Sequence, residues 1–147
     1  MAKRRSINSR AKRVEVSVQQ YLWPNTTFAG NSKRPAFEDQ DVCGMDYQGD
    51  FWWGEVKNYS RETINNLGGT WKALEGALEQ ANNAIDRNKH VWQQYTEKRP
   101  KAFAVLWEKG SRDDNKRLVM LEHIGMLIVI KLTDFKKKFI DYGTELC

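Results

Sequence analysis

Asp41, Glu55 and Lys57 are the residues of this chain whose types and spacing best suit chemistry. Two carboxylates held close together repel each other unless a cation lies between them. Oxygen ligands favour a hard divalent ion, so we expect Mg²⁺ at Asp41 and Glu55, with Mn²⁺ able to replace it. A lysine two residues after Glu55 lies on the same face of a strand and can stabilise an anionic substrate oxygen or orient a water molecule. The three residues therefore predict a metal site that acts on an anionic substrate.

A β-hairpin is expected to bring the two carboxylates together. Residues 41–45 and 51–57 have the composition of strands, and the segment between them contains a glycine, which is typical of a hairpin turn. If Asp46 pairs with Asp50 across the turn, the two candidate carboxylates face each other with Cβ atoms about 5 Å apart. Alternation along the strand favours Asp41 over Asp46 as the metal ligand, because Asp46 belongs to the turn. The alternative is a cross-strand charge cluster at a sheet edge, with no metal.

The remaining pattern predicts a mixed β-sheet flanked by helices, in the approximate order αβββαβββα. The predicted helices cover residues 9–22, 70–88 and 134–142, and the predicted strands cover residues 26–29, 41–45, 51–57, 102–107, 116–122 and 126–131. Thr70 and Thr133 are expected to cap the second and third helices. The buried stripe of the second helix is expected to include Trp71. We therefore expect one α/β domain over residues 1–147, with a basic N-terminal arm over about residues 1–10.

Composition and charge limit the class of protein. The chain has 147 residues and contains 24 Lys and Arg against 19 Asp and Glu, a net charge of +5 that is compatible with a polyanionic partner. No apolar run approaches the roughly 20 residues that span a bilayer. No apolar stretch follows the basic start, so we expect an intracellular, cytoplasmic protein of cellular or viral origin, with no membrane partner. Two cysteines and two histidines are too few for a disulfide scaffold or a zinc finger, which leaves an oxygen-ligated metal.

The basic residues are concentrated near the start of the chain. The segment from Lys3 to Arg13 contains no acidic residue, and it leads into the first predicted helix. Such a segment is either a solvated terminus or an arm that contacts phosphates. The candidates for phosphate contacts here are Arg10, Lys12 and Arg13.

Asp41, followed after the hairpin by Gly-Glu55-Val-Lys57, resembles the core of the PD-(D/E)xK nucleases and is most similar to archaeal- and phage-type Holliday junction resolvases. Those enzymes add a glutamate in the first helix, and Glu15 occupies the matching place. They also carry a basic, Ser/Gly-rich loop, to which residues 28–34 are similar, whereas the proline usual before the aspartate is Gln40 here. The resemblance covers residues 10 to about 108 and implies a restriction-endonuclease-like core, with a C-terminal β-hairpin and helix added.

The resemblance also implies a set of roles. The Val56 carbonyl and the carboxylates of Asp41, Glu55 and Glu15 would hold one or two Mg²⁺ ions, and Lys57 would complete the catalytic set. The reaction would be phosphodiester hydrolysis that leaves 5′-phosphate and 3′-hydroxyl ends, in DNA recombination and repair. The residues that would grip the DNA backbone near the cleaved bond are Ser32, Lys33 and Arg34.

Two symmetric cuts in a four-way DNA junction require two sites related by a two-fold axis, so the resemblance implies a homodimer. Exposed aromatic residues and the apolar segments 118–121 and 126–130 are candidates for the dimer surface. The alternatives are another nicking or restriction-type PD-(D/E)xK nuclease, and a nucleic-acid-binding module without catalysis. Several other residues are expected to be structural, namely Cys43, Trp52, Trp53, His90 and His123.

Overall fold

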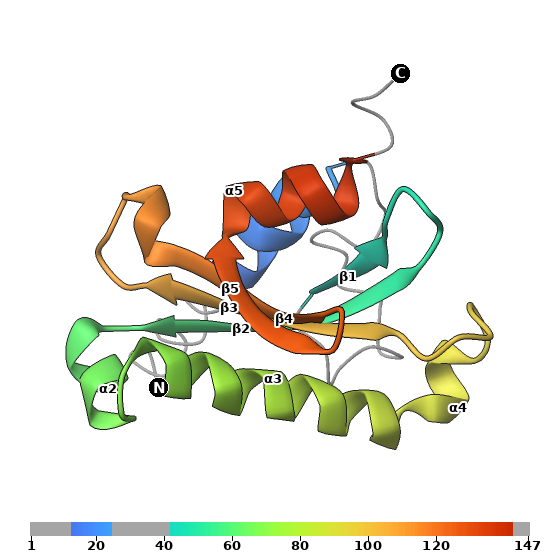
Figure 1. Ribbon diagram of the computed structural model, residues 1–147, viewed down its shortest axis with the longest axis horizontal. Helices are drawn as coiled ribbons and strands as arrows, with labels where there is room; N and C mark the ends of the chain where they lie inside the picture. The colour runs from blue at the N-terminus through green and yellow to red at the C-terminus, as the bar shows by residue number, and fades with distance from the viewer. Residues whose placement is uncertain (1–12, 25–41, 143–147) are drawn as a thin grey trace, which may run out of the picture.

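The computed structural model describes residues 13–24 and 42–142 (Figure 1). Its centre is a five-stranded mixed sheet with the strand order β1-β2-β3-β4-β5. The strands are β1 (Val42–Met45), β2 (Phe51–Tyr59), β3 (Lys101–Glu108), β4 (Arg117–His123) and β5 (Met126–Lys131). Strands β2 and β3 are parallel, and the other neighbours are antiparallel. The predicted α/β fold with helices flanking a mixed sheet is confirmed.

Helices cover both faces of this sheet. The long helix α3 (Thr70–Arg87) follows the short helix α2 (Arg61–Asn66) and lies along one face (Figure 1). The helix through residues 13–22 and α5 (Leu132–Phe135), which continues into η3 (Lys136–Ile140), lie against the other face. The remaining elements are α4 (Lys89–Trp92) and the 3₁₀ turn η2 (Asp114–Lys116). The sheet is therefore the middle of three layers.

Small and branched side chains fix α3 against the sheet. Its buried residues recur at helical spacing and are Ala73, Leu74, Ala77, Leu78, Ala81, Ala84 and Ile85. They pack on Ala104, Leu106 and Met120 of the central strands and on Trp53. The prediction that Trp71 belongs to this buried stripe is wrong, because its side chain is 45% exposed at the start of the helix.

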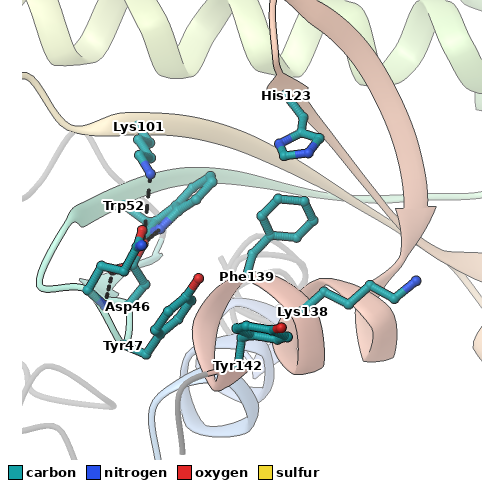
Figure 2. A pocket seen from close by; sticks show the side chains of 9 residues that line it. Asp46, Tyr47, Trp52, Lys101, His123, Lys138, Phe139 and Tyr142 are labelled. Carbon is teal, nitrogen blue, oxygen red and sulfur yellow. Dashed lines mark hydrogen bonds and ion pairs between the residues drawn. The ribbon is translucent and has the colours of Figure 1, made fainter. Parts of the chain in front are cut away.

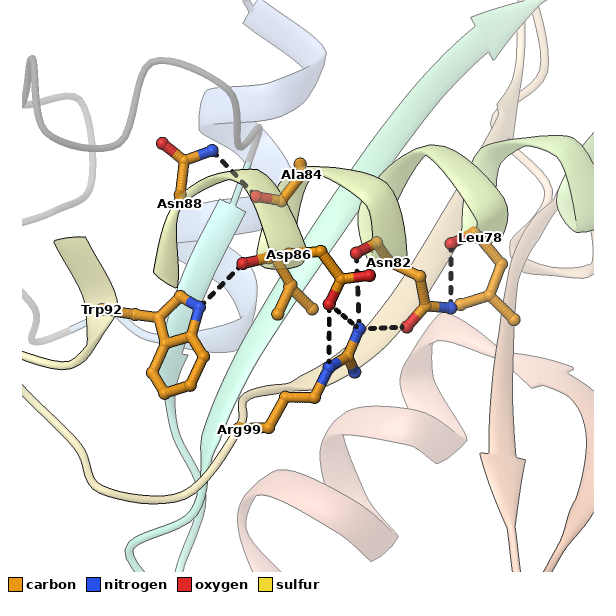
Figure 3. Close-up of polar contacts among 8 residues, drawn as sticks. Leu78, Asn82, Ala84, Asp86, Asn88, Trp92 and Arg99 are labelled. Atoms are coloured by element: carbon orange, nitrogen blue, oxygen red, sulfur yellow. Dashed lines mark hydrogen bonds and ion pairs between the residues drawn. The ribbon is translucent and has the colours of Figure 1, made fainter. Parts of the chain in front are cut away.

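Polar contacts fasten the C-terminal end of α3 to the connection that leads into β3 (Figure 3). The Arg99 guanidinium donates to the side chain and carbonyl of Asn82 and to the carboxylate of Asp86. The Trp92 indole N–H donates to the Ile85 carbonyl at 2.8 Å. These contacts hold the β2–α3–β3 crossover in place. A crossover connection of this kind is needed to join two parallel neighbours such as β2 and β3.

Aromatic rings fill the opposite layer. Trp52, Phe103 and Phe135 are buried, with the Phe103 and Phe135 rings stacked at a centroid distance of 4.9 Å. Two glycines allow aromatic rings to pack directly against the strand backbone. A Cβ on Gly54 would lie closer than 3.0 Å to the ring of Phe103, and one on Gly44 would meet the ring of Trp23 in the same way. The glycines are therefore needed for the close approach of ring to backbone rather than for an unusual turn.

The hairpin register follows the prediction wherever it is described. The Asp46 N–H donates to the Asp50 carbonyl at 2.9 Å, and Val42 lies opposite Gly54. Trp52 and Trp53 are both buried, as expected, and so is Cys43. The predicted strand at residues 26–29 and the position of Asp41 lie outside the described residues.

Four details of the helices differ from the prediction. Gly69, with φ of 107°, is the N-cap of α3 instead of Thr70, because the backbone enters the helix from a conformation that glycine adopts easily. The last helix begins at Leu132, so Thr133 lies inside it instead of capping it. That helix widens to π geometry over Lys136–Ile140. Helix α2 was not predicted, although Ser60 caps it by accepting from the Thr63 N–H.

Candidate functional site

Glu55 and Lys57 lie side by side on the face of β2 that is turned toward α3. Side chains alternate along the strand, and Trp53 and Tyr59 on the same face pack against the apolar clusters around α3. The Lys57 Nζ lies 3.8 Å from the Glu55 Oε1, and the two side chains are 22% and 16% exposed. Glu55 and Lys57 therefore form a half-buried ion pair between the apolar cluster at Trp53 and the one at Tyr59.

The helix through residues 13–22 is fastened to the outer edge of β1. The Gln19 side-chain amide accepts from the Cys43 N–H at 2.9 Å and donates to the Cys43 carbonyl at 2.7 Å. One turn later the Trp23 indole N–H donates to the Met45 carbonyl at 2.8 Å. The four residues from Gln19 to Trp23 rise about 6 Å along a helix, and the two residues from Cys43 to Met45 rise about 6.7 Å along a strand. The two attachment points are therefore about equally spaced on the helix and on the strand. The side of the helix that meets β1 also carries Glu15, one turn before Gln19, toward the N-terminal end of β1.

The ladder between β1 and β2 also fixes the direction of the Val56 carbonyl. In an antiparallel pair, every second residue points its N–H and C=O toward the partner strand. Asp50 does so, since its carbonyl accepts from Asp46, and the same phase along β2 includes Gly54 and Val56. The Val56 carbonyl therefore points to the β1 side of β2.

The predicted site residues divide into those that are described and those that are not. Glu15 and Glu55 are half-buried, Lys57 is paired with Glu55, and Arg13 is exposed. The predicted residues outside the described part of the chain are Arg10, Lys12, Ser32, Lys33, Arg34 and Asp41. Within residues 13–24 and 42–142, no group of three or more His, Cys, Asp or Glu side chains could hold a metal ion. The described side chains alone therefore do not make up such a cluster, and the predicted ligand Asp41 lies outside them.

Asp46 has a structural role in the hairpin turn. Its Oδ1 accepts from the backbone N–H groups of Gln48 and Asp50, and its Oδ2 accepts from the Trp52 indole N–H, all at 2.9 Å. The carboxylate is 2% exposed and lies on the face of the hairpin opposite to Glu55. This separation removes Asp46 as the alternative metal ligand. The signal in the sequence was an aspartate at the start of a glycine-containing turn, where its side chain commonly binds the following N–H groups.

The neighbouring Asp50 makes the stability of the fold depend on acid pH. Lys101 Nζ lies 2.9 Å from the Asp50 Oδ2. The hydrogen bond from Lys101 lowers the pKa of Asp50 below its ordinary value of 3.8, against a smaller desolvation effect, and the charges of Lys101 and Lys98 act in the same direction as the hydrogen bond. The folded carboxyl group therefore stays ionised at a lower pH than the unfolded one.

Replacing Asp50 with Asn should flatten the dependence of stability on pH in acid. Between the lowered folded pKa and about 3.8, the unfolded chain binds more protons than the folded one, so the free energy of unfolding rises with pH. This contribution is complete above that window and is lost as the pH falls through the folded pKa. Urea unfolding of the wild type and Asp50→Asn across the acid range measures the difference. Identical pH dependence of the two proteins would contradict the assignment.

No described helix combines the length and the apolar character needed to cross a membrane. The site residues that the described structure brings together are Glu55 and Lys57 on β2, whereas Glu15 lies on the helix beside β1. Compared with known proteins, the chain matches no family model, no curated protein and no solved structure.

Proposed function

We propose that this protein is a metal-dependent DNA endonuclease with a PD-(D/E)xK site that nicks four-way junctions. The observation that carries the proposal is the Glu55–Lys57 pair, half-buried and side by side on β2. The order of elements around the pair adds support. The β1–β2 hairpin is followed by α3 and by β3, the helix and strand that the resemblance covers, and β3 lies parallel to β2.

The chemistry of the pair favours catalysis over simple DNA binding. A carboxylate repels phosphate, so a binding surface has no use for Glu55 at its centre, whereas Lys57 alone would attract phosphate. Lys57 is proposed to stabilise the negative charge that develops on the phosphate oxygens or to orient the attacking water. Its ammonium is kept in place by Glu55 and by burial of its stem.

The proposed ligands of this site suit a hard cation. Glu55, Glu15 and the Val56 carbonyl all offer oxygen atoms, which Mg²⁺ and Mn²⁺ prefer. Asp41 is proposed as the further ligand, and this requires the β1–β2 register to extend by one residue pair beyond Val42 and Gly54. Bound Mg²⁺ supplies a water molecule of lowered pKa and polarises a phosphoryl oxygen.

A homodimer is proposed to supply two such sites to one junction. β5 is the last strand of the sheet, and no other strand in the described part of the chain pairs with its outer side. The turn before β5 and the first residue of β5 expose apolar side chains, with Ile124 86% and Met126 67% exposed. Two-fold pairing of β5 with a second copy would cover this edge. The net charge of +5 favours the approach of DNA to such an assembly.

Metal removal tests the proposal directly. An end-labelled four-way junction and a linear duplex of the same arm sequence are each incubated with the protein, in Mg²⁺ or in EDTA. We expect paired symmetric nicks in the junction with Mg²⁺ or Mn²⁺, and no product in EDTA until Mg²⁺ is restored in excess. Cleavage that persists in EDTA would overturn the metal site. Equal cutting of the linear duplex would favour a nicking or restriction-type nuclease, and binding without any cleavage would favour a non-catalytic module.

A further inference from the structure

A cavity of about 500 Å³ lies on the face of the sheet opposite to Glu55 and Lys57. It is open to solvent and is lined by the β1–β2 turn, the start of β3, the end of β4, and η3 with the residues just after it (Figure 2). Asp46, Trp52 and Lys101 lie on one side, and Phe139, Tyr142 and Lys138 lie on the other, with His123 near β4 (Figure 2). The volume is within the range of pockets that hold small organic ligands.

Aromatic rings form much of the cavity wall. Tyr47 and Tyr142 face each other at a centroid distance of 5.5 Å and an interplanar angle of 57°, and they are 40% and 45% exposed. Phe139 also lines the cavity and is held by contacts with the rings of Trp52, Phe135 and His123. The two tyrosine rings contact each other while part of their surface stays open. Such rings favour a flat, unsaturated ligand.

The charges at the cavity indicate the sign of that ligand. The Asp46 carboxylate already accepts three hydrogen bonds, so it offers little to a bound molecule. Lys101 is paired with Asp50, and its ammonium lies 5.3 Å from the centre of the Trp52 ring. A cationic ligand therefore cannot bind over that ring, because Lys101 already occupies the position. No ion pair joins Lys138 to an acid of the described residues, and Lys138 contributes a positive charge to the rim. The remaining polar groups at the wall include the tyrosine hydroxyls and His123, which can donate hydrogen bonds.

From these features we infer that the cavity binds an unpaired nucleotide, with its base against Tyr47 and Tyr142 and its phosphate near Lys138. A nucleotide combines a flat base, hydrogen-bond acceptors and a negative charge. The base matches the tyrosine rings, the acceptors match the tyrosine hydroxyls and His123, and the charge matches Lys138. A base inside a duplex is stacked on both faces, so only an unpaired base can present a face to the tyrosines. The ligand is either a free nucleotide or one nucleotide of a single strand, such as an unstacked residue at a branch point.

Binding at this cavity is separable from the proposed cleavage. The cavity and the Glu55–Lys57 pair lie on opposite faces of the sheet, and neither residue lines the cavity. Binding can therefore be measured in EDTA, where no cleavage is expected, and in the Glu55→Gln background, where cleavage is expected to be about 10³-fold slower. Loss of nuclease activity leaves this measurement intact, so the two proposals fail independently.

The test measures binding of fluorescent oligothymidine, of the same sequence as a duplex, and of thymidine monophosphate as a competitor. Tyr47→Ala and Tyr142→Ala should each weaken binding of the single strand by about tenfold, because one stacking contact is lost. Tyr47→Phe and Tyr142→Phe keep the ring and should retain most of the affinity. Tyr95→Ala, which removes a tyrosine that is 50% exposed but does not line the cavity, is the matched control and should have no effect.

A charge variant tests the phosphate contact. Lys138→Gln should reduce the slope of log K against log salt concentration by about 0.7, the value for one phosphate contact with a single strand. Lys137→Gln removes the same charge from the same turn but does not line the cavity, and it should change the slope less. Competition by the monophosphate would assign a free nucleotide, and its absence would assign a nucleotide within a strand. The inference is overturned if the tyrosine variants bind like the wild type, or if both lysine variants lower the slope equally.

Discussion

Glu55→Gln is expected to lower the rate of junction cleavage by about 10³-fold, equivalent to about 4 kcal/mol of transition-state stabilisation. The substitution keeps the size of the side chain but removes its negative charge. A neutral amide is a weaker ligand for Mg²⁺. It also leaves the Lys57 ammonium without the carboxylate that lies 3.8 Å away. Single-turnover cleavage of a labelled junction in Mg²⁺ measures the effect.

The control for Glu55→Gln is Glu79→Gln, the same change at an exposed position of α3. Glu79→Gln should cleave like the wild type. Junction binding and the urea unfolding midpoint of Glu55→Gln should stay close to those of the wild type, which separates a loss of chemistry from a loss of fold. Undiminished cleavage by Glu55→Gln, or an equal loss in Glu79→Gln, would remove Glu55 from the metal site.

Gly54→Ala is expected to destabilise the fold by about 1–3 kcal/mol, the usual cost of overpacking a core. The added methyl group would lie closer than 3.0 Å to three carbons of the Phe103 ring. Phe103 is fully buried and stacked on Phe135, so it has little room to move. Urea unfolding should show a lower midpoint with an unchanged slope. Because Gly54 precedes Glu55, cleavage should fall as well.

Gly76→Ala provides the opposite result in the same assay. Gly76 lies in the middle of α3, and a Cβ there would meet nothing within 4 Å. Alanine is favoured over glycine inside a helix by about 1 kcal/mol, so the variant should be more stable than the wild type. A stable Gly54→Ala protein would mean that the ring and the strand can separate at little cost. A destabilised Gly76→Ala would mean that glycine is needed in α3 for another reason.

The hairpin and the central strands could be predicted because local patterns determine them. Alternating side chains and a glycine-containing turn specify both strand directions and the register, so Val42 lies opposite Gly54 as expected. The same pattern places Glu55 and Lys57 on one face of β2. The apolar runs at residues 126–131 and 102–107 similarly match β5 and most of β3.

Other features depend on contacts between distant parts of the chain, which spacing does not reveal. The role of Gln19 needs the outer edge of β1, which lies 24 residues further along the chain. Trp71 fits the helical stripe by period but precedes the part of α3 that reaches the sheet. The cavity at Tyr47 and Tyr142 joins a hairpin turn to the last helix, and neither tyrosine stands in a motif. The predicted pairing of Asp41 with Glu55 stays a prediction.

The bonds from Gln19 and Trp23 to β1 have a consequence for how copies of this protein can associate. A sheet that is open at both edges can recruit strands without limit, and the product is a fibre. Here the helix side chains occupy both outward backbone groups of Cys43 and the carbonyl of Met45, which hinders strand addition along the described part of β1. In the homodimer proposed above, β5 would pair with β5 of the second copy, and each copy would then present only its hindered edge. Growth would therefore stop at a finite, two-fold particle.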